Sequence, residues 1–167
     1  HVPVPVTTVS SDGAEGAADI RIRTAERADL LEIHRLEQAV FPQPWPFAAL
    51  ENYLGEPGFL VADTDTNDAR VAGYIIADAV PNHGTPLGHV KDLAVRAEYR
   101  REGIATTLLE RALSVLESVD AASAKLEVRA ENEGAMDLYR SFDFEHQKTI
   151  PNYYSNGEDA LVMVRLL

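Results

Sequence analysis

The chain has no cysteine among its 167 residues, and this absence excludes several kinds of chemistry at once. Disulfide frameworks, thiolate metal sites and a cysteine nucleophile are all ruled out. The five histidines, at positions 1, 34, 83, 89 and 146, show no spacing typical of metal ligands, so we expect no bound metal. A chain of this length is typical of one domain whose core is large enough to fold alone.

Long apolar runs are also missing from the sequence. None approaches the length of a membrane-spanning helix, and the first residues form neither a charged leader nor a continuous apolar block. We therefore expect a cytoplasmic protein that makes no use of a membrane.

Basic residues are few, because 15 lysines and arginines face 27 acidic residues and leave a net charge of −12. This balance argues against nucleic acid as a partner. The acidic residues are scattered from Asp12 to Asp159 rather than gathered in one run. The scatter favours a solvation adaptation to a salty cytoplasm, as in a halophilic archaeon, while attraction of a basic polypeptide substrate stays open as the alternative.

Residue patterns divide the chain into a tail and one domain. Residues 1–18 mix proline, glycine and serine without apolar periodicity and are predicted to be a disordered tail, whereas residues 19–167 form a single domain. Helices connecting the central strands indicate an α/β fold with a mixed sheet. The predicted strands cover residues 19–23, 58–63, 71–79, 90–95, 124–129, 144–150 and 160–166, and the predicted helices cover 24–40, 47–54, 103–118 and 132–139.

A glycine-containing turn joins the fourth predicted strand to the long helix. Gly103 can adopt backbone angles closed to other residues, and the small Ala105 allows a ligand to approach the helix N-terminus. Arg100 and Arg101 add positive charge beside it. The pattern is typical of a pyrophosphate cradle, although a basic turn that opens an ordinary helix would look the same.

Four further segments agree in spacing with a known family. They are Leu-Glu-Val-Arg at 126–129 with Asn132, Leu138-Tyr139 with Phe144, Asn152-Tyr153-Tyr154, and Gly157-Glu158-Asp159-Ala160. Together they resemble a GNAT acetyltransferase over about residues 20–167, and more narrowly the RimI-like branch that acetylates protein N-termini. The histidine in Gly88-His89-Val90 is similar to archaeal members.

This resemblance implies a fold and a cosubstrate. The fold would have about six or seven strands in a mixed central sheet and about four flanking helices, with two central strands splayed to admit acetyl-CoA. No metal is required. The residues that the resemblance assigns to acetyl-CoA are Leu93, Ala94 and Val95 for the acyl-pantetheine arm, Arg100, Arg101, Gly103, Ile104, Ala105 and Thr106 for the pyrophosphate, and Asn132 for the distal arm.

Acetyl transfer requires a base, because an α-amino group with a pKa of about 8 is mostly protonated at neutral pH. Strand alternation points Glu127 to the face opposite Leu126 and Val128, and a buried carboxylate is costly without a role or a partner. A salt bridge to Arg129, two residues on and on the same face, is the structural alternative. The resemblance favours Glu127 as the base.

Two other side chains are candidates for proton transfer. His89 could share the base role because an imidazole titrates near neutral pH, but alternation places it on the face of Lys91 and Leu93, and either face could be the cleft. Tyr139 could donate a proton to the departing thiolate, and its alternative is an ordinary core tyrosine on an amphipathic helix.

Aromatic side chains at two junctions are candidates for binding the acceptor peptide. Phe41 and Trp45 follow the first helix, and Tyr153 and Tyr154 lie in the last hairpin. Their rings could wall off the first side chain of a peptide. We expect a monomer that acetylates protein N-termini, with an auxiliary subunit possible as a partner. The rival functions are acetylation of lysine or a small amine, and a non-catalytic CoA-binding module.

Overall fold

A computed structural model describes residues 20–64 and 70–167, and the predicted tail at 1–18 lies outside the described residues. Seven strands form one mixed sheet in the order β1-β2-β3-β4-β5-β7-β6. The elements are β1 (Arg21–Thr24), η1 (Arg27–Asp29), α1 (Leu30–Val40), α2 (Phe47–Glu51), β2 (Phe59–Asp63), β3 (Val71–Val80), β4 (Leu87–Val95), η2 (Ala97–Tyr99), α3 (Ile104–Ser118), β5 (Ser123–Arg129), α4 (Glu133–Ser141), β6 (Glu145–Ile150) and β7 (Ala160–Leu166).

The predicted order of strands and helices is confirmed, and the largest shift of a boundary is at the start of the first helix. A helix starting at Thr24 was expected, but α1 begins at Leu30 and a 3₁₀ turn precedes it. The reason is a capping box, in which the Asp29 carboxylate accepts a hydrogen bond of 2.7 Å from the backbone N–H of Glu26. This reciprocal cap satisfies donors that a longer helix would have paired internally.

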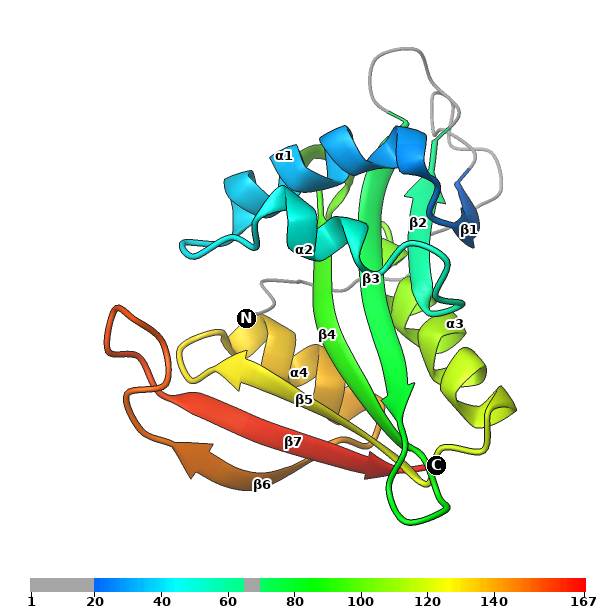
Figure 1. Ribbon diagram of the computed structural model, residues 1–167. Coiled ribbons are helices and arrows are strands. Elements are labelled where there is room, and N and C mark those ends of the chain that lie inside the picture. Colours follow the sequence, from blue (N-terminus) through cyan, green and yellow to red (C-terminus); the bar gives the residue numbers. More distant parts are fainter. Residues whose placement is uncertain (1–19, 65–69) are drawn as a thin grey trace.

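Two helix pairs cover the two faces of the sheet (Figure 1). Helices α1 and α2 pack on one face of β2, β3 and β4 over a core that includes Leu30, Ile33 and Tyr74. Helices α3 and α4 pack on the other face, where Leu108, Leu109 and other apolar side chains form the larger core. The periodic apolar residues predicted for these helices are therefore the ones that are buried.

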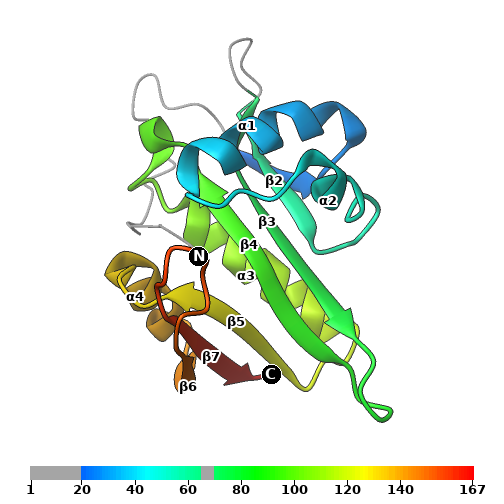
Figure 2. The same ribbon diagram turned by 60° about the vertical axis from the view of Figure 1, so that its left-hand side comes forward.

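The central strands β4 and β5 separate along their length. They are parallel and pair only at Gly88 with Ala124 and at His89 with Lys125. Figures 1 and 2 show the two strands meeting at one end and diverging toward the other. A Cβ at Gly88 would lie 2.7 Å from a Leu116 methyl and 2.9 Å from the Ser123 carbonyl oxygen, so only glycine allows this close junction. The predicted splay of two central strands is confirmed.

A β-bulge in β4 corrects the predicted orientation of its side chains. Asp92 pairs with Ile76 and Val90 pairs with Ala77, which leaves Lys91 as the extra residue. Simple alternation placed Leu93 on the face of His89 and Lys91. The extra residue reverses the alternation, so Leu93 lies in the core under α3 while His89 and Lys91 face the opposite side.

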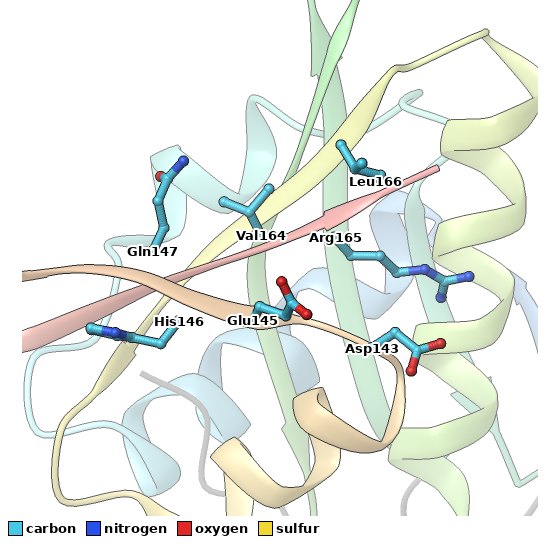
Figure 3. A pocket seen from close by; sticks show the side chains of 7 residues that line it. All are labelled: Asp143, Glu145, His146, Gln147, Val164, Arg165 and Leu166. Carbon is cyan, nitrogen blue, oxygen red and sulfur yellow. The ribbon is translucent and has the colours of Figure 1, made fainter.

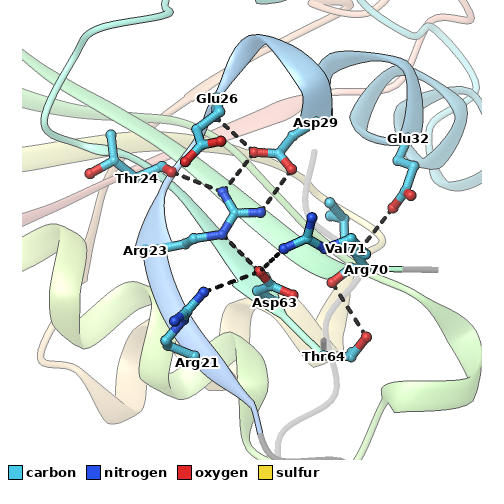
Figure 4. A network of polar contacts seen from close by, with 10 residues as sticks. All are labelled: Arg21, Arg23, Thr24, Glu26, Asp29, Glu32, Asp63, Thr64, Arg70 and Val71. Atoms are coloured by element: carbon cyan, nitrogen blue, oxygen red, sulfur yellow. Dashed lines mark hydrogen bonds and ion pairs between the residues drawn. The ribbon is translucent and has the colours of Figure 1, made fainter. Parts of the chain in front are cut away.

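A buried ion-pair network fixes the β1 edge of the sheet (Figure 4). The Asp63 carboxylate is fully buried and lies 2.8 Å from Nε of Arg23 and 3.1 Å from Nη2 of Arg70. Arg23 also binds Asp29 through two contacts of 2.8 Å. Burial alone would raise the pKa of Asp29, but the hydrogen bonds from Arg23 and the Glu26 backbone lower it below its ordinary value. The network ties β1, β2 and η1 together, and β3 lies between it and β4.

Candidate active site

His89 and Glu127 form the chemical centre of the site, one on each of the diverging strands. Nε2 of His89 and Oε2 of Glu127 are 2.7 Å apart, and their side chains are 24% and 18% exposed. Burial alone would raise the pKa of Glu127, but the hydrogen bond and charge of His89, with the charge of Lys125, hold it below the ordinary value. The carboxylate is thus ionised at neutral pH and orients the imidazole.

Arg129 does not form the salt bridge with Glu127 that was considered as the structural alternative. Its Nη1 lies 3.0 Å from Oε1 of Glu158, and its guanidinium stacks on the Tyr154 ring at 3.9 Å from the centroid. It therefore anchors the β6–β7 loop to β5. Lys125 is the nearer cation to Glu127, at 4.0 Å from Oε1.

A pocket of about 310 Å³ opens beside His89 and Glu127. Three of the four predicted peptide-binding residues line it, whereas Phe41 is 4% exposed and packs in the core under α1, away from the lining. Sequence reasoning missed Gln43 and Tyr53, because nothing in their neighbourhood distinguishes them from loop residues. The full lining is Gln43, Trp45, Tyr53, His89, Val90, Lys91, Glu127, Tyr153 and Tyr154.

A larger hollow of about 510 Å³ lies on β6 and β7 (Figure 3). Its lining comes mainly from the exposed edge strand β6 and from the end of β7. Neither His89 nor Glu127 reaches it, and it is distinct from the gap between β4 and β5. The smaller pocket is therefore the candidate site. The hollow is lined by Asp143, Glu145, His146, Gln147, Val164, Arg165 and Leu166.

The edge of β4 offers backbone groups to the gap. The Arg96 N–H donates to the Ala72 carbonyl on the β3 side at 2.8 Å, and hydrogen-bonding direction alternates along an antiparallel strand. The N–H groups of Leu93 and Val95 therefore point away from β3 toward the gap, whereas that of Ala94 points to β3. Of the three residues predicted to contact an acyl-pantetheine arm through their backbone, Leu93 and Val95 have the suitable direction.

The turn before α3 has the geometry of an anion cradle. Arg101 and Gly103 both have left-handed backbone conformations, with φ of 67° and 75°, and α3 begins at the next residue, Ile104. Oγ1 of Thr106 is buried in the first turn with no hydrogen-bond partner among the described residues. Ile104 and Ala105 turn their side chains into the core, so they offer only backbone N–H groups. A buried hydroxyl without a partner beside exposed helix amides fits a phosphate.

Two residues of the α4 region complete the set of predicted site residues. The Tyr139 side chain is fully buried, and its hydroxyl has no hydrogen-bond partner in the part of the chain that the structure describes. Burial first, then the charges of Asp92 and Tyr154, raise its pKa well above the ordinary value, so it stays protonated. Oδ1 of Asn132 accepts a hydrogen bond from the Ala135 N–H at 3.1 Å and caps α4.

The sequence matches one family model and several curated proteins. Residues 29–144 match the acetyltransferase (GNAT) family. The chain is 35% identical over 161 residues to an N-alpha-acetyltransferase of Saccharolobus solfataricus, covering 89% of this chain and 94% of that protein. No membrane-spanning helix and no cluster of candidate metal ligands occurs within residues 20–64 and 70–167.

Solved structures share the fold over most of the chain. The ribosomal-protein-S18-alanine N-acetyltransferase from Escherichia coli superposes with a TM-score of 0.75 at 29% identity, over 89% of this chain and 94% of that one. Arabidopsis thaliana Naa50, solved with the bisubstrate analogue CoA-Ac-MVNAL, gives a TM-score of 0.78 at 25% identity, over 87% and 97%. The fold that the sequence resemblance predicted is confirmed.

Proposed function

The chain belongs to the GNAT acetyltransferase family, and from this premise we propose that it transfers the acetyl group of acetyl-CoA to the α-amino group of a protein N-terminus. The transfer is direct, within a complex of enzyme, acetyl-CoA and peptide. A bond forms between the amine nitrogen and the acetyl carbon, and the thioester C–S bond breaks. The acetylated peptide and free CoA are the products.

In this proposal the base is the pair formed by His89 and Glu127. The Glu127 carboxylate, ionised at neutral pH, orients the imidazole, and the pair accepts the proton that the attacking amine loses. The Tyr139 hydroxyl, held protonated by its burial, supplies a proton to the leaving sulfur. Glu127 and His89 act as one unit, so removal of either lowers the rate.

The acetyl donor would lie along the gap between β4 and β5. The backbone N–H of Val95 faces this gap, whereas that of Leu93 already donates to Oδ1 of Asp92. The cradle at Arg101, Gly103 and Thr106 would hold the pyrophosphate. A backbone N–H at the thioester carbonyl can contribute about 3 kcal/mol to the transition state. That Naa50 was solved with an analogue that joins CoA to a peptide supports acetyl-CoA and a peptide as the two substrates.

The observation that carries the proposal is the position of the pocket. A cavity of about 310 Å³ with aromatic walls meets the strand gap where His89 and Glu127 lie 2.7 Å apart. Trp45, from the loop after α1, and Tyr153, from the loop between β6 and β7, both line the pocket and would enclose the first residue of a peptide.

The test is incubation with acetyl-CoA and a library of peptides with free N-termini, followed by mass spectrometry that locates the acetyl group. We expect acetylation at the α-amine. A parallel library has blocked N-termini and internal lysines. If only the blocked library or small amines were acetylated, the substrate would be a different amine; no acetylation in either library would refute an enzymatic role.

We also propose that the protein acts as a monomer in the cytoplasm and that an auxiliary subunit can join it. The Escherichia coli relative is named for acetylating a ribosomal protein, and a substrate of that kind would place the reaction in the cytoplasm. The size of the protein in solution, alone and with cell extract, measures its assembly state.

A further inference from the structure

Two carboxyl groups and a phenol are buried together between α1 and the sheet. Glu37 of α1, Tyr74 of β3 and Asp92 of β4 are each 0% exposed. Burying two acids in a core is costly, and apolar residues of similar volume would often be as stable. Such a cluster calls for an explanation beyond packing.

The hydroxyl of Tyr74 links the two acids. It lies 2.5 Å from Oε1 of Glu37 and 3.0 Å from Oδ2 of Asp92. A phenol has one proton and can donate to only one of them, so the other contact requires a protonated carboxyl. Burial first, then hydrogen bonding and repulsion by Asp92, raise the pKa of Glu37 to about 9. Burial raises the pKa of Asp92 as well, so the cluster holds an extra proton at neutral pH between the two carboxyl groups.

The outer oxygens of the same two acids hold backbone amides. Oε2 of Glu37 accepts a hydrogen bond of 2.8 Å from the Trp45 N–H, and Oδ1 of Asp92 accepts one of 3.1 Å from the Leu93 N–H. Trp45 lines the acceptor pocket, and Leu93 lies on the β4 edge that faces the gap. The cluster therefore contacts the acceptor pocket at Trp45 and the gap-facing edge of β4 at Leu93.

We propose that Glu37, Tyr74 and Asp92 are positioning residues that hold the acceptor loop in fixed register with the gap-facing edge of β4. This inference rests on the proposed function. The loop at residues 41–46 has no regular secondary structure, and the end of β4 has no strand partner on the β5 side. Immediately after the bulge at Lys91, where β4 has no backbone pairing with β5, the cluster holds β4 in place through side chains.

Fixed register matters because the amine nitrogen must approach the acetyl carbon to about 3–3.5 Å before it reacts. Each substrate contacts only one end of the cluster. Loss of the contacts through the Tyr74 hydroxyl should therefore leave each substrate bound but misalign the amine nitrogen and the acetyl carbon. The expected signature is a lower kcat with nearly unchanged KM values.

The kinetic test removes one hydroxyl with Tyr74→Phe. We expect kcat for α-amine acetylation to fall about tenfold, because small misplacements of reacting groups carry large rate costs. The KM values for peptide and acetyl-CoA should stay within about twofold of wild type. Asp92→Asn is the second variant and should behave alike, since its new amide disturbs the contact with Tyr74. A wild-type kcat in both variants would overturn the proposal.

The control is Asp63→Asn, an equivalent acid-to-amide change at a fully buried carboxylate on β2, next to the edge strand β1. It should lower the melting temperature and leave kcat unchanged well below that temperature. If Asp63→Asn lost as much kcat as Asp92→Asn at an equal loss of stability, the effect would be general and the positioning role would be refuted.

A second readout does not depend on catalysis. Amide hydrogen exchange of Trp45 and Leu93 should accelerate together in Tyr74→Phe, because both amides donate to the acids that this hydroxyl connects. Exchange that accelerates at one amide alone, or at neither, contradicts the link. If the wild-type protein acetylated no α-amine, the proposed function would fail while the exchange result still decided whether the cluster joins the two segments.

Discussion

The proton held by the buried acids gives the protein a distinctive dependence of stability on pH, and Glu37→Gln should remove it. The glutamine side chain has the shape of the carboxyl group that it replaces. Its amide oxygen can still accept a hydrogen bond from the Trp45 N–H, and its NH₂ group can donate one to Asp92, but it has no proton that titrates. In the wild-type protein the pKa of Glu37 is raised from 4.5 to about 9 by burial and by Asp92. Between those values the folded state keeps a proton that the unfolded chain releases.

The sign follows from proton linkage. Because the folded state binds more protons in this window, the free energy of unfolding falls as the pH rises, by up to about 1.4 kcal/mol for each pH unit. From pH 6 to pH 8 the Glu37→Gln variant should therefore gain up to about 2.7 kcal/mol relative to wild type. For a domain of this size that corresponds to roughly 5–10 °C in melting temperature.

Urea unfolding of both proteins at pH 6, 7 and 8 measures this gain. The control is Asp29→Asn: because the pKa of Asp29 is lowered, the group is ionised in both states above pH 6, and its loss should cost the same stability at every pH tested. Parallel stability curves for wild type and Glu37→Gln would show that the buried acids hold no extra proton and would refute the reasoning.

Four further outcomes are expected. Glu127→Gln should lower kcat by about 10²–10⁴-fold with acetyl-CoA affinity unchanged, as measured by steady-state kinetics and calorimetry. An unchanged kcat would show that Glu127 is not part of the base. Tyr139→Phe should slow the reaction with little loss of stability, and wild-type turnover would leave that tyrosine a core residue. Gly103→Val should weaken acetyl-CoA binding, since a φ of 75° strains a β-branched residue by about 1–3 kcal/mol. Equal affinity for acetyl-CoA in a binding titration would refute the role of this turn in holding the pyrophosphate. If the net charge of −12 is a salt adaptation, the melting temperature should rise strongly with molar KCl, and full stability in dilute buffer would contradict it.

Periodicity was sufficient to predict the elements and the direction of Glu127. Apolar spacing located α3 and its buried face, and strand alternation turned Glu127 away from Leu126 and Val128. Both signals are local, since each depends only on the geometry of one helix or one strand. The resemblance supplied the splay between β4 and β5, which no local pattern encodes.

Features that depend on contacts between distant segments could not be predicted in the same way. The bulge at Lys91 is set by pairing with β3, so the face of Leu93 was wrong. Phe41 was expected at the peptide pocket, but the packing of α1 against the sheet buries it. Glu37 reads in sequence as an ordinary polar residue of an amphipathic helix. Its burial becomes apparent only when Tyr74 and Asp92 are brought beside it.

The single inserted residue in β4 has a consequence for engineering the protein. In the proposed function, the strand up to Lys91 contributes side chains to the acceptor pocket, and the strand beyond it contributes backbone groups to the gap. Acceptor preference could therefore be redesigned through the side chain at position 91, while His89 keeps its role as base and the donor contacts, which are made by main-chain atoms, stay the same. Deleting Lys91 would undo this separation, because the upstream side chains would exchange faces: His89 would enter the apolar interior and Val90 would leave it.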